Sequence, residues 1–265
     1  MKKTIRKNRS SEVVKFSKNL SSQLTVHSSL GFTLAEVLIT LGIIGVVAAM
    51  TIPILIANNQ KAQYVTALQK GYTEFNQALI QISTDYGCTG DLQCTGLFAN
   101  GTTNDTLGQA LVRYFNVTKN CGTINQNTSG QNSCMSMFAS NNFDGTSARY
   151  GIDVNYRFII ADGMSFRILN YGTNCSLDAA IGSTGSLTQA CGYIQMDVNG
   201  PLKGPNNFGR DIFVFYITNG KGPLLYPQGG QDYISPWKTN ACIPSNTWGA
   251  PCSGRIMDES WQMNY

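Results

Sequence analysis

Histidine is almost absent from this chain, since its 265 residues contain one, His27. Residues 28–265 therefore offer no Ser-His or Cys-His nucleophile pair and no imidazole general base. Walker-type phosphate loops, the dinucleotide fingerprint G-x-G-x-x-G and the nucleophile motif G-x-S-x-G are missing as well. The sequence therefore predicts a protein that is not an enzyme and has no catalytic residues.

Charged residues are also scarce, at 13% of the chain against about 25% in typical domains. Residues 1–30 hold seven basic residues and one acid, Glu12, which gives this segment a net charge of +6. The rest has 12 basic and 14 acidic residues, a net charge of −2. It lacks the basic surface that nucleic-acid binding requires, so no nucleic-acid partner is expected.

One long apolar run extends from Phe32 to Ile56, and Glu36 is its only charged residue. A run of this length can span a bilayer as a helix. The basic segment before it should stay on the cytoplasmic side, which places residues after the run outside. An acid inside such a run costs on the order of 3 kcal/mol on insertion scales. Glu36 is therefore expected to have a partner.

The segment around Glu36 reads Gly31-Phe32-Thr33-Leu34-Ala35-Glu36-Val37-Leu38. It resembles the processing site of type IV prepilins and type II secretion pseudopilins. The resemblance is specific over residues 31 to about 56, where Gly42, Gly45 and Pro53 also match. It implies that a prepilin peptidase cuts after Gly31 and methylates Phe32, and that Glu36 guides filament assembly.

Cleavage would create a cationic amine on Phe32. We expect this amine to pair with Glu36 of a neighbouring subunit inside an apolar filament core, because pairing offsets the desolvation of both charges. Two alternatives stay open. The run could be an uncleaved signal anchor, or a signal peptide cut near Val47-Ala48-Ala49, although its 25 residues exceed the 7 to 15 of a usual apolar core.

After the run, apolar residues recur in steps of three and four and predict one apolar helix face. They are Val65, Leu68, Tyr72, Phe75, Leu79, Ile82 and Tyr86. The run and this segment predict one helix of roughly 50 residues, bent near Pro53 and ended by Gly87. A coiled coil over about three heptads is the alternative, but packing against the chain's own globular head is favoured.

The later sequence predicts a sheet. Residues 156–161 and 164–169 flank Asp162-Gly163 and indicate a hairpin with a two-residue type I′ turn. Two further strands are expected at 192–198 and 211–218, and residues 224–226, bounded by prolines, can add a short edge strand. Residues 88–148 are turn-rich with one short helix at 106–115. Four antiparallel strands on the long helix define an α+β, pilin-like fold.

The expected parts are a removed leader (1–31), a membrane and filament-core helix (32–56), an amphipathic helix (57–87) and a disulfide-braced head (88–265).

All eight cysteines follow the apolar run, and an even number in an exported segment favours disulfides. Eight cysteines allow 105 pairings, and we favour sequence neighbours because each pair would close a short polar loop. These pairs are Cys88–Cys94, Cys121–Cys134, Cys175–Cys191 and Cys242–Cys252. Zinc is disfavoured, because no pair has C-x₂-C spacing and no histidine follows the run.

One loop has the oxygen ligands that calcium prefers. Asp197, Asn199, Asn206 and Asp211 lie in a Gly- and Pro-rich segment between two predicted strands. The segment is not an EF-hand, because its twelfth position is Phe208. The favoured interpretation is a loop whose Asp and Asn side chains cap their own backbone, with calcium as the alternative cofactor. No other cofactor is expected.

The sequence thus predicts a filament subunit of the bacterial inner membrane, later part of a periplasmic or cell-surface filament. The expected partners are other pilin or pseudopilin subunits, prepilin peptidase and the inner-membrane assembly machinery. The rival is a signal-anchored binding or adhesion protein that does not polymerise. Major pilin, minor pilin, competence pilin and secretion pseudopilin remain open, because a shared fold does not decide among them.

Overall fold

The computed structural model describes residues 31–124, 134, 141–146, 154–179, 183–219, 222–233, 242 and 248–265. The chain divides into two compact units, Met1–Met50 and Thr51–Tyr265. One helix, α1, contributes to both and covers Leu34–Asp85, 52 residues. In the described part of the first unit, α1 is the only regular element. It is long and apolar enough to cross a membrane by length and composition.

The C-terminal end of α1 is formed by a left-handed glycine. Gly87 has φ 73°, a conformation that costs glycine little because it has no Cβ. The Cys88 N–H donates to the carbonyl of Ser83 at 2.7 Å, and the Gly87 N–H donates to that of Thr84 at 2.9 Å. These bonds satisfy carbonyls that the last turn leaves without helical partners. The predicted stop at Gly87 is confirmed.

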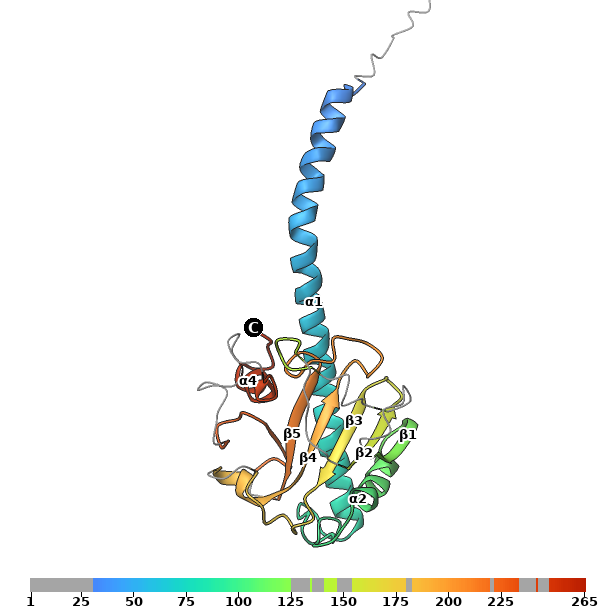
Figure 1. Ribbon diagram of the computed structural model, residues 1–265, viewed down its shortest axis with the longest axis vertical. Helices are drawn as coiled ribbons and strands as arrows, with labels where there is room; N and C mark the ends of the chain where they lie inside the picture. Colours follow the sequence, from blue (N-terminus) through green and yellow to red (C-terminus); the bar gives the residue numbers. More distant parts are fainter. Residues whose placement is uncertain are drawn as a thin grey trace, which may run out of the picture. The chain divides into compact units, whose positions relative to one another are not determined.

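The second unit is built on a six-stranded antiparallel sheet in which spatial order equals chain order. The strands are β1 (Val117–Ile124), β2 (Asn155–Ile160), β3 (Ser165–Asn170), β4 (Ala190–Asp197), β5 (Ile212–Thr218) and β6 (Leu225–Pro227). The part of α1 in this unit crosses one face of the sheet (Figure 1). The predicted α+β class is confirmed, and the architecture is consistent with a pilin-like fold.

The core forms where the α1 stripe meets the sheet. Val65, Leu68, Phe75, Leu79 and Ile82 are buried, as the periodicity predicts. The ring of Phe75 lies 5.5 Å from the rings of Phe115 and Phe166. Two stripe positions differ from this pattern. Tyr72 is only partly buried, and Tyr86 is 50% exposed because it follows the end of the helix.

Short helical elements also lie around the sheet in the described part of the chain. Helix α2 (Asn104–Leu111) continues into a 3₁₀ turn, η1 (Val112–Tyr114). A second 3₁₀ turn, η2 (Gly185–Gln189), precedes β4, and helix α4 (Cys252–Asp258) contacts β5 and β6. The predicted short helix at 106–115 therefore exists but begins earlier, because Thr103 caps its N-terminus by accepting a bond from the Thr106 N–H.

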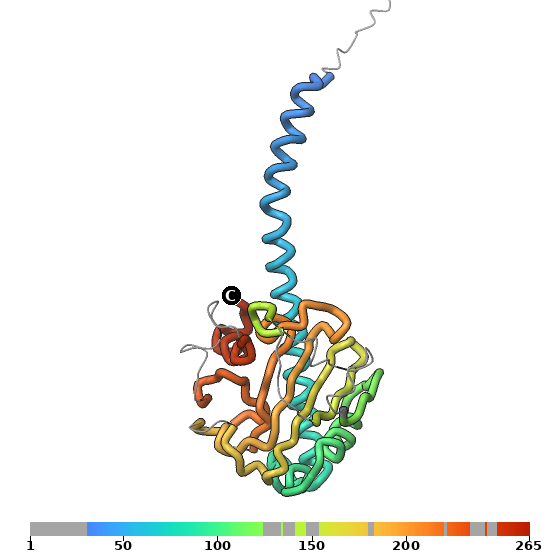
Figure 2. Tube along the Cα trace, in the orientation of Figure 1, coloured from blue at the N-terminus to red at the C-terminus, as the bar shows by residue number. Residues whose placement is uncertain are grey.

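The prediction of four strands on the long helix was wrong, because β1 was not predicted and the edge strand expected at 224–226, β6, belongs to the same sheet. Strand β1 lies within residues 88–148, where only turns and one short helix were expected. Strand β1 pairs with β2 through two register shifts, between Val117 and Lys119 and between Asn120 and Gly122. Such irregularities interrupt the alternation of side chains by which a strand is recognised in sequence. The tube trace in Figure 2 follows the same chain path from α2 through β1.

The hairpin between β2 and β3 is confirmed, but its predicted two-residue type I′ turn is wrong. The Ile160 N–H donates to the Met164 carbonyl at 3.0 Å, and the Gly163 N–H donates to the Ile160 carbonyl at 2.9 Å. The loop therefore has three residues, with positive φ at Gly163 but not at Asp162. Asp162 instead accepts the Met164 N–H through its side chain at 3.0 Å. This is the three-residue hairpin with a glycine bulge.

All eight cysteines are joined in sequence-neighbouring pairs, and no free thiol remains among them. The disulfides are Cys88–Cys94, Cys121–Cys134, Cys175–Cys191 and Cys242–Cys252. Each closes a loop of at most 16 residues, and loops of about 15 residues gain about 3 kcal/mol in the chain-entropy model. Each bridge therefore constrains a short segment of the second unit.

Candidate processing segment and candidate head sites

The start of α1 is a capping box formed by Thr33 and Glu36. The backbone N–H and the hydroxyl of Thr33 each donate to Glu36 Oε2, both at 2.8 Å. In return, the Glu36 N–H donates to Thr33 Oγ1 at 3.2 Å. The first helical bond then runs from the Val37 N–H to the Thr33 carbonyl. This reciprocal arrangement satisfies backbone donors that a helix N-terminus otherwise leaves without partners.

Glu36 therefore already has a partner within its own chain, Thr33, in addition to the expected partner on a neighbouring subunit. The signal was present, because Thr33-Leu34-Ala35-Glu36 is the pattern Ser/Thr-x-x-Glu that precedes an apolar helix. The cap also fixes where the helix begins. Gly31, Phe32 and Thr33 precede α1 and are exposed, Phe32 to 86%. The Gly31–Phe32 peptide bond thus lies outside the helix.

The four candidate calcium ligands lie at the ends of and within the loop between β4 and β5, where Asp197 and Asp211 are close enough for their charges to interact. Asp197 Oδ1 accepts the Gly200 N–H at 2.9 Å. The Asp211 carboxylate accepts the backbone N–H groups of Asn206 and Asn207 at 2.8 and 2.7 Å. The side-chain caps expected for a turn-rich loop are therefore present. Both carboxylates are buried, with 1% and 0% of Asp197 and Asp211 exposed.

Two features of the loop go beyond a turn. Burial, together with the Asp211 charge, raises the pKa of Asp197 to about 8, and burial likewise raises the pKa of Asp211. The buried amide oxygens of Asn199 and Asn206 accept no hydrogen bond. A buried acceptor without a partner costs about 1–3 kcal/mol. Two carboxylates and two amide oxygens form a donor set that fits a hard cation such as calcium.

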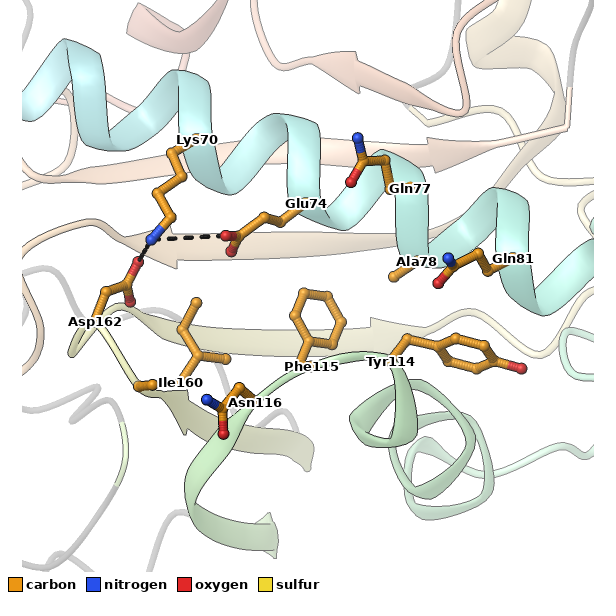
Figure 3. Close-up of a pocket in the computed structure, with 11 residues that line it drawn as sticks. Lys70, Glu74, Gln77, Ala78, Gln81, Tyr114, Phe115, Asn116, Ile160 and Asp162 are labelled. Atoms are coloured by element: carbon orange, nitrogen blue, oxygen red, sulfur yellow. Dashed lines mark hydrogen bonds and ion pairs between the residues drawn. The ribbon is translucent and has the colours of Figure 1, made fainter.

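A polar groove lies where α1 faces the β2–β3 hairpin, and Figure 3 shows its lining. The Lys70 ammonium is 2.7 Å from an Asp162 oxygen and 3.6 Å from a Glu74 oxygen. The hydrogen bond to Asp162 raises the pKa of Lys70. At the far end, the Tyr114 hydroxyl donates to Asp85 at 2.7 Å, and this bond raises its pKa to about 12. The groove has a volume of about 320 Å³. Ionic and polar contacts at its two ends connect α1 to the β2–β3 hairpin and to η1.

Within the described residues, no group of three or more His, Cys, Asp or Glu side chains is gathered as a metal site. Any cation in the β4–β5 loop would thus be held by two carboxylates and neutral oxygens.

Residues 27–52 match the prokaryotic N-terminal methylation motif. This is the type IV prepilin-like signal, so the resemblance carried by residues 31–56 is confirmed. The match includes Gly31, Phe32 and Glu36, and the motif belongs to a structural, pilin-type family rather than to an enzyme class. No curated protein and no solved structure matches the chain. The motif therefore indicates prepilin-type processing, pilin-type subunits as partners and membrane anchoring through the apolar helix.

Proposed function

We propose that this protein is a structural subunit of a type IV pilus-like or type II secretion pseudopilus filament. Prepilin peptidase cleaves it after Gly31 and methylates Phe32, and the mature chain assembles through its N-terminal helix. The observation that carries the proposal is the methylation motif on a helix that begins at Leu34, two residues after Phe32, so that the Gly31–Phe32 bond stays outside it. A peptide bond outside a helix can enter a protease site without local unfolding.

The apolar run suits two environments in turn, first the lipid of the inner membrane and then the core of a filament. Its large apolar side chains are exposed, from Phe32 at 86%, just before α1, to Ile56 at 54%, within it. An apolar surface of this extent requires lipid first and a partner surface later. Gly42 and Gly45 have no atom within 4 Å of the space a Cβ would fill. Small residues of this kind let helices approach closely in an apolar medium. The helix can therefore leave the inner membrane for a bundle of equivalent helices, with the head outside the cytoplasm.

The rival function is an anchored binding protein that keeps its leader. N-terminal mass spectrometry of the chain co-expressed with prepilin peptidase separates the two. We expect a mature protein that begins at Phe32 and carries one added methyl group. A Gly31→Val variant, which changes only the residue before the cut, should keep its leader. An intact leader in the unmodified chain, or a start at Met50 after Val47-Ala48-Ala49, would contradict the proposal.

For the β4–β5 loop we propose calcium binding. The observation that favours it is the pair of buried amide oxygens without donors, on Asn199 and Asn206, beside two buried carboxylates. Calcium would be bound by the two carboxylates and the two amide oxygens, and its charge would balance the charges of the two carboxylates. The turn interpretation explains the backbone caps of the loop but leaves those two oxygens without partners.

Calcium should therefore stabilise the protein against heat. At a calcium concentration 100 times the Kd, binding to the folded state adds about 2.7 kcal/mol. An Asp197→Asn variant should lose most of this gain, whereas Asp144→Asn, which alters an exposed acid, should keep it. Thermal unfolding with calcium and with a chelator measures the difference. Equal midpoints in the two conditions would leave only the turn interpretation.

A further inference from the structure

The position of the apolar run in the sequence sets how far the adjoining end of the second unit would lie from the hydrocarbon core of a bilayer. The last six residues of the run, Thr51–Ile56, belong to this unit and are exposed. Lys61 comes five residues after Ile56, which is about 7–8 Å along a helix axis. The polar layer on each side of a bilayer core is about 5–8 Å thick. Lys61 therefore lies at the level of the lipid headgroups when the run is inserted.

A hollow of about 450 Å³ opens at this level between α1 and the β4–β5 loop. Lys61 and Tyr64 line it from α1, and Gly204, Pro205 and Arg210 line it from the loop. The Lys61 ammonium donates to the backbone oxygen of Tyr265. The hollow therefore has a cationic side chain on each of its two walls.

The loop beside this hollow carries the most exposed apolar side chain of the described residues. Leu202 is 90% exposed, while the other exposed large apolar residues beyond α1, among them Tyr86 and Leu177, reach at most 50%. A single exposed leucine needs no explanation by itself. Here, however, Lys203 follows it directly and Arg210 closes the same loop, and both are exposed. An exposed apolar side chain next to a cation suits the bilayer interface, where apolar groups enter the acyl boundary and Lys or Arg meets anionic headgroups.

The acids of this loop do not oppose its cations at the surface. Asp197 and Asp211 are buried and accept backbone N–H bonds, so the exposed charges of residues 197–211 are Lys203 and Arg210. On the neighbouring helix α4, Arg255 is 2.9 Å from Glu259. The charged side chains that line the hollow, Lys61 and Arg210, are both cations and complement the phosphates of anionic lipids, while the exposed acid Asp144 follows the lining residue Phe143.

We propose that this end of the unit is a docking surface for the headgroups of an anionic phospholipid bilayer. Leu202 enters the interface, and Lys61, Lys203 and Arg210 meet lipid phosphates. The proposal requires insertion of the apolar run but neither cleavage nor polymerisation, so it stands or falls separately from the filament function. The bilayer is favoured over a second copy of the chain because Thr51–Ile56, the part of the run within this unit, would set this surface at headgroup depth.

The test is hydrogen exchange of the full, uncleaved chain in nanodiscs that hold one copy each. Discs of phosphatidylcholine are compared with discs that also contain phosphatidylglycerol. We expect the peptide covering residues 199–206 to exchange more slowly in the anionic discs, and less so at high salt. Each basic residue near an anionic surface strengthens binding about fivefold. The ratio of the membrane-bound, protected form of residues 199–206 to the exchanging, unbound form should therefore fall about fivefold for Lys203→Gln in the anionic discs. Leu202→Ser should lower the same ratio in both kinds of disc.

Arg113→Gln is the matched control. It removes an exposed cation from η1, next to the Tyr114–Asp85 contact at the C-terminal end of α1, more than 20 residues along the helix from Lys61. It should leave exchange at 199–206 unchanged. Equal exchange in the two kinds of disc, or an Lys203→Gln variant that behaves like the unmodified chain, overturns the proposal. Protection that appears only with two copies per disc assigns the surface to a second copy and overturns it as well.

Discussion

Replacing Phe75 with alanine is expected to lower the free energy of unfolding by about 3–5 kcal/mol, the cost of truncating a fully buried phenylalanine. Phe75 packs from α1 against the aromatic residues of the core. It has no exposed surface, and its ring lies 5.5 Å from both Phe115 and Phe166. Alanine would leave a cavity between helix and sheet that neither neighbour can fill without moving a strand or a loop.

Ile80→Ala on the same helix is the matched control. Its side chain is 49% exposed, so its removal should change stability by no more than about 0.5 kcal/mol, as for most surface substitutions. Urea unfolding of the full chain in detergent, followed by tryptophan fluorescence, measures both variants. Similar losses for Phe75→Ala and Ile80→Ala would show that α1 is not part of the cooperative unit formed with the sheet.

Glu36→Gln is expected to abolish filament assembly while leaving the start of α1 intact. Glutamine also serves in a capping box, so the bonds to Thr33 can persist. The negative charge is lost, and the amine of a neighbouring Phe32 would then be buried without a counterion. Leaving one partner of a buried ion pair uncompensated costs about 3–5 kcal/mol. Electron microscopy of cells that carry the assembly machinery measures the outcome.

Thr33→Val is the converse variant. It removes the hydroxyl that caps α1, at a cost of about 1 kcal/mol, and keeps the Glu36 charge. Filaments should still form, and mass spectrometry should still find Phe32 methylated. If Glu36→Gln assembles normally and Thr33→Val does not, the acid serves as a helix cap and the proposed intersubunit pair is wrong.

The long helix could be predicted because its signals are local. The apolar run, the stripe of three- and four-residue steps and Gly87 each lie within a few turns of the feature they determine. The β2–β3 hairpin was likewise visible, but its turn was not. Ala161-Asp162-Gly163 fits a two- or a three-residue loop, and the choice depends on register, which the pairing of Ile159 with Ser165 sets.

The site residues show a similar division. Residue types alone pointed to the β4–β5 loop as a source of oxygen ligands, but the burial of Asp197 follows from its place in the sheet between Ser165 and Ile212. The unpaired oxygens of Asn199 and Asn206 depend on loop packing that no spacing rule encodes. By contrast, the Thr33–Glu36 cap can be predicted from the local pattern Thr-x-x-Glu. It was not among the expectations, because Glu36 was expected to pair only with a neighbouring subunit.

The sheet order β1 to β6 has a consequence for export. Every strand pairs with its neighbours in the chain, and every disulfide joins adjacent cysteines. Contacts of low sequence separation form quickly, because little loop entropy is lost before each pairing is made. A chain that emerges outside the membrane behind α1 can therefore add each new strand to the edge formed just before. Its folding need not wait for the C-terminus to arrive.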